Sequence, residues 1–139
     1  MTGLAKCASK YSGWAPTILR VILAVVFIAH GYGKLWGSAP GLTAWTGMIT
    51  GMGMPAFMAY VAAGIEFFGG ILVLLGFFTR YAALLIAVVM VFAVALVKAK
   101  LGLVGGYELD IALFADAAGL VMLGPGKLSL EKAWFKKEY

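Results

Sequence analysis

The chain has 139 residues, of which 63% are hydrophobic and 12% are charged, and its formal net charge is +5. A soluble domain is about half apolar and about a quarter charged, and 11 Lys and Arg with 6 Asp and Glu are too few to cover a soluble fold of this length. The composition therefore excludes an ordinary soluble domain and indicates that most of the chain faces lipid.

Four apolar stretches follow one another along the chain, at about 17–32, 56–78, 81–97 and 107–123. A spanning helix needs roughly 20 residues, and fewer where its ends are polar. The first two stretches follow Pro16 and Pro55, which suit the first turn of a helix, and the last ends at a Gly-Pro-Gly sequence that cannot easily continue one. We therefore expect an all-α fold, a single membrane domain built as a four-helix bundle, with an outer loop at 33–55 and a tail at 124–139.

The basic residues are distributed unevenly about these stretches. With four spans, both termini and the short turn after the second span share one side, and the positive-inside rule assigns the more basic side to the cytoplasm. That side carries Lys6, Lys10, Arg20, Arg80, Lys127, Lys132, Lys136 and Lys137, whereas the other carries Lys34, Lys98 and Lys100. Both termini are predicted to be cytoplasmic. The basic tail, which also contains Trp134 and Phe135, suits an anionic lipid surface.

Six ionisable residues in or beside the first, second and fourth stretches fall in the half of the bundle away from the termini. They are His30 and Lys34 in and just after the first stretch, Glu66 in the second, and Glu108, Asp110 and Asp116 in the fourth. A charge in lipid costs at least ~2.5 kcal/mol unless it finds a partner or water, so we expect these side chains to face one another. Lys34 could pair with Glu108 or Asp110. His30 could pair with Glu66 or Asp116.

Small residues surround Glu66 at spacings of three and four, the spacing that lets membrane helices approach closely. They are Ala59, Ala62, Ala63, Gly69, Gly70 and Gly76. We therefore expect Glu66 to point between helices, where a carboxyl either holds the packing together or belongs to a functional site. Intramembrane acids usually mark proton, ion or substrate paths.

Four motifs occur in order: HG..K at the end of the first stretch, E..GG...LLG..TR in the second, YE opening the fourth and GPG..S at its close. Together, over about 19–134, they resemble the DoxX family of small four-helix bacterial membrane proteins. The family's polar signature would fall on His30, Lys34, Glu66 and Glu108. The resemblance implies a multi-pass protein of the bacterial cytoplasmic (inner) membrane.

The family resemblance also implies a function in membrane redox chemistry. Relatives of the DoxD and DoxA types form a thiosulfate:quinone oxidoreductase, and others are associated with oxidative stress or thiol redox proteins. We therefore expect a membrane subunit of a redox complex, quinone- or sulfur-linked, whose redox cofactor is carried by other protein subunits.

A quinone site needs an apolar slot and a hydrogen-bond or proton donor at each carbonyl, because reduction takes up two protons with two electrons. His30 would be the proton exchanger, with Glu66 or Asp116 as relay. Lys34 would hold a semiquinone or an anionic oxoacid, near Glu108 and Asp110. The site's mouth would be lined by Trp36, Trp45 and Tyr107.

Plainer interpretations stay open beside this one. Lys34 could be a snorkelling anchor, the aromatic residues an interfacial belt, and His30 a hydrogen-bonded packing residue. The protein could instead be a small proton-coupled carrier or channel, or a structural or assembly subunit whose buried charges only fix packing.

The small number of His and Cys side chains limits the metal cofactors that this chain could hold by itself. One histidine and one distant Cys7 cannot build a haem, iron–sulfur or zinc site. Nucleic acid is not an expected partner, because the basic residues flank the membrane stretches. The loop at 33–55 is long enough to have a function, and its Trp45, Ile49 and Met residues could form a short helix covering the polar residues.

Overall fold

The computed structural model describes residues 3–37 and 41–136, and these two ranges contain helices and turns but no strand. Three helices within them are long and apolar enough to cross a membrane: Gly3–Trp36, Phe57–Leu75 and Thr79–Leu101. The predicted fourth span is the 16-residue helix α7 (Glu108–Leu123). The all-helical expectation is confirmed for the described residues, whereas the count of four spans and their orientation stay predictions.

The N-terminal part of the chain is helical almost throughout. Helix α1 (Gly3–Tyr11) is joined by the short turn η1 (Ser12–Trp14) to α2 (Ala15–Trp36), which has Pro16 in its first turn. Helix α2 continues beyond the predicted end at 32. Lys34 and Trp36 therefore lie on a helix and not in a loop, so their side chains are held at defined positions around its axis.

A short helix, α3 (Gly41–Gly51), occupies most of the predicted outer loop. The next stretch is one continuous helical rod made of α4 (Phe57–Gly64), a π-helical turn η2 (Ile65–Gly69) and α5 (Gly70–Leu75). A tight turn follows, in which Gly76 and Phe78 both have positive φ.

The second half of the chain begins with α6 (Thr79–Phe92), which continues through a π-helical segment η3 (Ala93–Lys98) and a 3₁₀ turn η4 (Ala99–Leu101). An irregular segment η5 (Leu103–Tyr107) leads into α7, and the described chain ends with α8 (Leu130–Phe135). Helix α6 therefore starts slightly before the predicted 81–97 stretch, and its helical continuation carries Lys98.

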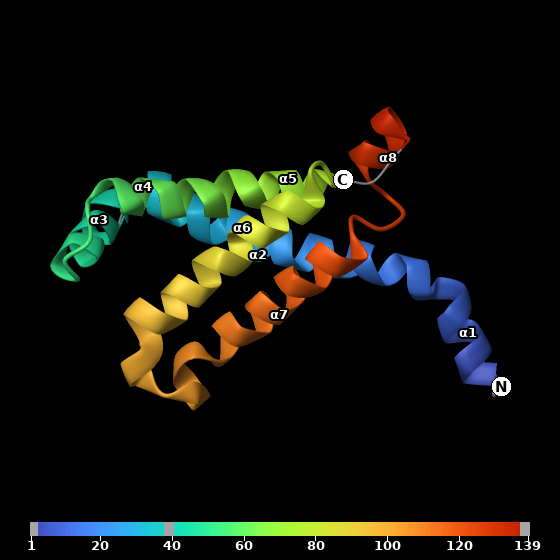
Figure 1. Ribbon diagram of the computed structural model, residues 1–139, viewed down its shortest axis with the longest axis horizontal. Helices are drawn as coiled ribbons and strands as arrows, with labels where there is room; N and C mark the ends of the chain where they lie inside the picture. The colour runs from blue at the N-terminus through green and yellow to red at the C-terminus, as the bar shows by residue number, and fades with distance from the viewer. Residues whose placement is uncertain (1–2, 38–40, 137–139) are drawn as a thin grey trace.

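The bundle is built from two antiparallel pairs that pack against each other (Figure 1). Helix α2 packs along the rod α4–η2–α5, and α6 packs along α7, with η2 also contacting α6. Leu23, Phe27, Val73, Ile86 and Leu120 are buried between them. The predicted small-residue face is also buried, at Ala59, Ala63, Gly69 and Gly70. Large apolar side chains are left on the outside, as expected for a protein surrounded by lipid.

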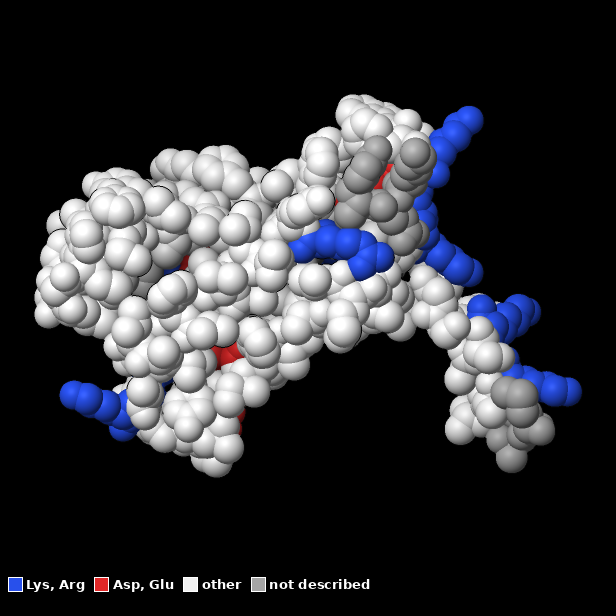
Figure 2. Space-filling model, viewed as in Figure 1, with Lys and Arg blue, Asp and Glu red and all other residues white. Residues whose placement is uncertain are grey.

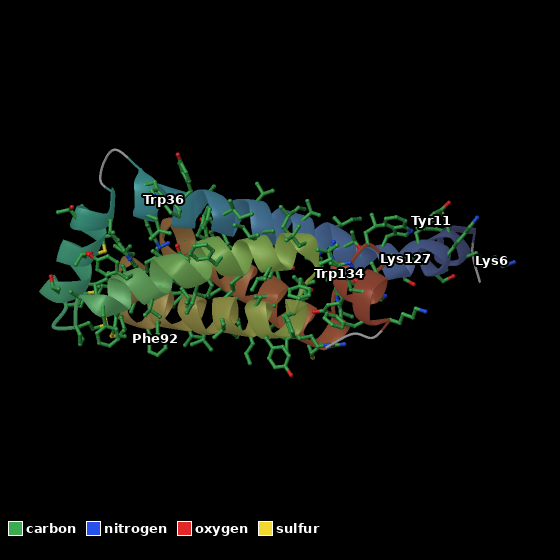
Figure 3. All side chains as sticks on the ribbon, turned by 90° about the horizontal axis from the view of Figure 1, so that it is seen from above. Lys6, Tyr11, Trp36, Phe92, Lys127 and Trp134 are labelled. Atoms are coloured by element: carbon green, nitrogen blue, oxygen red, sulfur yellow. The ribbon has the colours of Figure 1, made fainter. Side chains whose placement is uncertain are left out.

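The two ends of the bundle differ in charge. Helix α3 lies at one end, here called the α3 end, and α1 and α8 lie at the other, the α8 end (Figure 1). Figure 2 shows most Lys and Arg side chains at the α8 end, and Figure 3 labels Lys6 and Lys127 there. This agrees with the predicted grouping of basic residues, except that Lys137 lies outside the described residues.

The tail packs against the bundle, which the sequence analysis missed. Glu131 is completely buried and accepts a hydrogen bond from the Thr79 backbone N–H at 2.8 Å. Arg20, 3% exposed, donates to the carbonyl oxygens of Pro125, at 2.9 Å, and Leu128. The segment after α7 is thus tied to the starts of α2 and α6.

Candidate functional site

Lys34 and Glu66 form an ion pair between α2 and the π-helical turn η2. The ammonium Nζ lies 2.6 Å from Oε1 and 2.7 Å from Oε2 of the carboxylate. Glu66 is only 3% exposed, whereas the Lys34 side chain is 23% exposed. A π-turn inserts an extra residue into a helix and is frequent at functional sites. Here it carries the one acid of the second predicted span.

The close approach of the two helices depends on Gly31. A Cβ added at this position would lie 2.7 Å from the Cα of Phe67, closer than real Cβ contacts allow. Because Gly31 has no side chain, the backbone of α2 can lie directly against η2, which brings Lys34, one turn further along, within reach of Glu66.

Trp45 of α3 covers the Lys34–Glu66 pair. The Lys34 Nζ lies 4.0 Å from the centroid of the Trp45 ring, within the range of a cation–π interaction. The indole Nε1 donates a hydrogen bond of 3.0 Å to the Ala59 carbonyl oxygen, which fixes the ring. The helix predicted inside the 33–55 loop is therefore present, and it covers this part of the polar set.

An apolar cavity of about 320 Å³ lies beside the pair. Its walls come from α4 and η2 on one side and from α6 and η3 on the other, with Trp45 and Ile49 of α3 at one end. Among the described residues that line it, Lys34 and Glu66 are the charged ones. Figure 3 labels Phe92, one of the lining residues, in the half of the bundle that also carries Trp36.

His30 does not take part in this arrangement. It is exposed, its Nδ1 lies 2.8 Å from the Val26 carbonyl oxygen, and it does not line the cavity. Four residues of helix turn roughly 400°, so positions four apart are rotated by roughly 40°. This rotation is enough to place Lys34 toward η2 and His30 toward the outside. The predicted pairing of His30 with Glu66 is wrong, because the imidazole Nδ1 lies at the Val26 carbonyl oxygen and the Glu66 carboxylate binds Lys34 instead.

The acids that open α7 also have partners other than those predicted. Asp110, 6% exposed, binds Lys98, whose Nζ lies 2.7 Å from Oδ2 and 3.0 Å from Oδ1. Glu108 is exposed and accepts a hydrogen bond from the Gly105 backbone N–H at 3.2 Å. The predicted pairing of Lys34 with either acid is therefore wrong. The η3 extension of α6 brings Lys98 to Asp110 instead.

Three further predicted site residues also lie outside the cavity lining. Trp36 is 56% exposed, and its ring packs against Phe67 at a centroid distance of 4.9 Å. Tyr107 is half-buried at the start of α7. Asp116 is half-buried on α7, and its Oδ1 is buried with no hydrogen-bond partner in the part of the chain that the structure describes.

The structure therefore brings together Lys34, Glu66 and Trp45 from the predicted set, and it separates them from His30 and the α7 acids. The sequence did not reveal the apolar wall contributed by α6 and η3, which includes Val88, Phe92 and Leu96, because the lining residues of α6 and η3 are all apolar. No group of three His, Cys, Asp or Glu side chains able to hold a metal occurs within residues 3–37 and 41–136.

Comparison with known proteins identifies the family. The DoxX family model matches residues 15–99, a stretch that contains every cavity-lining residue. The chain belongs to the DoxX family. Glu108, Asp110 and Asp116 lie outside the matched stretch of this DoxX protein.

Curated relatives of this DoxX protein come from several bacteria. A Bacillus subtilis protein named "Putative oxidoreductase CatD" is 38% identical over 119 residues, covering 86% of each chain. An uncharacterized protein of Haemophilus influenzae is 33% identical over 134 residues, covering 92% of this chain and 96% of the relative. The inner membrane protein YqjF of Escherichia coli is 37% identical over 70 residues, about half of each chain. No solved structure matches. With its apolar helices, the chain is a bacterial membrane protein.

Proposed function

We propose that this DoxX-family protein is the membrane subunit of a redox complex and that its cavity is a quinone site. The observation that carries the proposal is an apolar cavity of about 320 Å³ with one buried ion pair in its wall. Cavities of about 300–1,000 Å³ that are mostly apolar, with a few polar groups, are typical small-molecule sites. The relative named as an oxidoreductase, which aligns over most of both chains, adds support.

The residues of the pair have complementary roles in this proposal. Glu66 is the proton carrier, because a carboxylate at the cavity wall can take up or release a proton beside a ring oxygen. Lys34 holds the carboxylate in place and supplies the positive charge. Asp116, which has a buried oxygen without a partner in the described structure, is proposed as a second proton carrier outside the cavity. His30 would exchange protons at the surface.

The redox centre that exchanges electrons with the quinone is proposed to lie in another chain. The described residues hold no metal-binding group of His, Cys, Asp and Glu side chains, so we propose a partner subunit that carries the redox cofactor. We also propose that the protein crosses the inner membrane several times with both termini in the cytoplasm. The Lys34–Glu66 pair would then lie in the non-cytoplasmic half.

Gentle purification from the native membrane tests this function. Mass spectrometry of the proteins, quinones and pigments that accompany the chain should detect a cofactor-bearing partner and a quinone. An empty and solitary preparation would count against a redox role. In the intact complex, Glu66→Gln should abolish quinone-linked activity while the protein remains inserted. The matched control is Glu108→Gln, which changes an exposed acid outside the cavity.

A structural or assembly role is the second candidate, favoured by one observation. The Lys34 ammonium and the Glu66 carboxylate satisfy each other and join two helices, which is what a packing contact requires. In that case Glu66→Gln would lower the stability of the protein or its complex and leave the turnover of the assembled fraction unchanged.

A further inference from the structure

The open side of the cavity lies on the apolar outside of the bundle. Several side chains that line it are also strongly exposed: Val61 at 52%, Val88 at 44%, Phe92 at 52% and Leu96 at 48%. They belong to the rod α4–η2–α5 and to α6 with η3, both apolar enough to cross a membrane. On the face drawn in Figure 2, most of the surface between the two ends of the bundle is uncharged. A ligand can therefore reach the cavity between α4 and α6 without leaving the bilayer.

Among the described residues, the polar wall of the cavity has no free strong donor. Lys34 is donor-only with three N–H groups. Its Nζ contacts both oxygens of Glu66 and the face of the Trp45 ring. The indole N–H of Trp45 is used by the Ala59 carbonyl oxygen. A ligand that can only accept hydrogen bonds would have to break one of these contacts.

The same wall has free acceptor capacity. A carboxylate offers about four lone-pair positions on its two oxygens, and the hydrogen bonds described for Glu66 are those from Lys34, one on each oxygen. Glu66 lines the cavity. The wall is therefore suited to a ligand that donates a hydrogen bond, and an O–H donor on a charged acceptor is one of the stronger hydrogen bonds in proteins.

We propose that the cavity takes its ligand sideways from the lipid and binds it as a hydroquinone, with a ring hydroxyl donating to Glu66. The ring lies between α4 and α6, and the hydrocarbon tail leaves past Val61 and Leu96 into the bilayer. This proposal rests on the proposed function, because it names the form of quinone that the same cavity prefers and the route by which it enters.

Binding to the purified protein in lipid nanodiscs tests the preferred form. Three decyl-substituted probes are compared under anaerobic conditions, with empty nanodiscs subtracted: the hydroquinone, the quinone and the hydroquinone dimethyl ether, which has no O–H. The hydroquinone should bind about tenfold more tightly than either of the others, the value of one hydrogen bond to a charged group. Equal affinity for the hydroquinone and its dimethyl ether would overturn the donor argument.

Two tryptophan substitutions test the lateral route. Val61→Trp and Leu96→Trp fill the opening from opposite walls, and each should weaken hydroquinone binding about tenfold or more. The control is Val25→Trp, since Val25 is 57% exposed on α2 and does not line the cavity. Because the two substitutions lie on different helices, the test still works if one of the variants fails to fold.

The outcomes separate the two proposals. If the quinone binds as well as the hydroquinone, the inference on the preferred form is wrong. If Val61→Trp and Leu96→Trp both bind hydroquinone as well as Val25→Trp does, the inference on the lateral route is wrong. In either case the quinone site itself stands. If none of the three probes binds the wild-type protein, the proposed function falls together with the inference.

Discussion

Replacing Lys34 by Met tests whether the ion pair is formed as the structure shows. The change leaves Glu66, 3% exposed, as a buried carboxylate without its ammonium partner. Removing one partner of a buried pair costs about 3–5 kcal/mol of unfolding free energy, because the remaining charge is uncompensated. The opposite change, Glu66→Gln, leaves an ammonium whose side chain is 23% exposed and whose long stem can reach the surface. Its expected loss is about 1–2 kcal/mol, between the values for exposed and buried pairs.

The assay is a double-mutant cycle on unfolding in a fixed lipid–detergent mixture. The double variant should lose less stability than the sum of the two single variants, because no unpaired charge remains in it. The control is Lys100→Met, which removes an exposed lysine and should change stability by no more than about 0.5 kcal/mol. Additive losses, or a loss for Lys34→Met no larger than that for Glu66→Gln, would refute the reasoning.

Three other predictions follow from single contacts. Trp45→Phe keeps a ring over Lys34 but removes the hydrogen bond from the indole to the Ala59 carbonyl oxygen. Amide hydrogen exchange in α3 should become faster, with a loss of about 1 kcal/mol in the local stability of this helix. Unchanged exchange would show that this bond does not hold α3. Gly31→Ala should destabilise the protein by about 1–3 kcal/mol, because the added Cβ meets the η2 backbone. Gly33 has open space around it, so Gly33→Ala should be neutral or slightly stabilising by helix propensity. Similar thermal unfolding of the two variants would contradict the close packing. Glu131→Gln removes the buried charge near Arg20 and weakens the acceptor for the Thr79 N–H. Limited trypsin digestion should therefore cut the segment after α7 faster than in the wild-type protein. An unchanged digestion rate would mean that the charge does not hold this segment.

Much of the fold could be predicted because lipid imposes simple rules on sequence. Backbone polar groups in a bilayer must bond internally, so long apolar stretches become helices, and α7 begins and ends within a residue of its prediction. The small-residue face around Glu66 was also predictable, because close packing of membrane helices needs small side chains at regular spacing. Its buried members, Ala59, Ala63, Gly69 and Gly70, carry Glu66 with them into the bundle.

The partners of the charged residues could not be predicted in the same way. The predicted depth in the membrane put Lys34 at the level of the α7 acids. Which ion pairs form, however, depends on how each helix is rotated about its axis and on where it ends. The π-turn at 65–69 and the helical extension to Lys98 change both of these properties. The sequence contains no periodic signal for either.

By itself the sequence determined that this protein is a helical membrane protein of the DoxX family with a charged residue buried between its helices. Apolar composition and helical periodicity are properties of residues that are close in sequence and of the solvent around them, so they can be read along the chain. Only the tertiary structure decided that Glu66 binds Lys34 under Trp45, and that an apolar cavity lies beside them. Those contacts join segments far apart in the chain, and they are selected by packing in three dimensions.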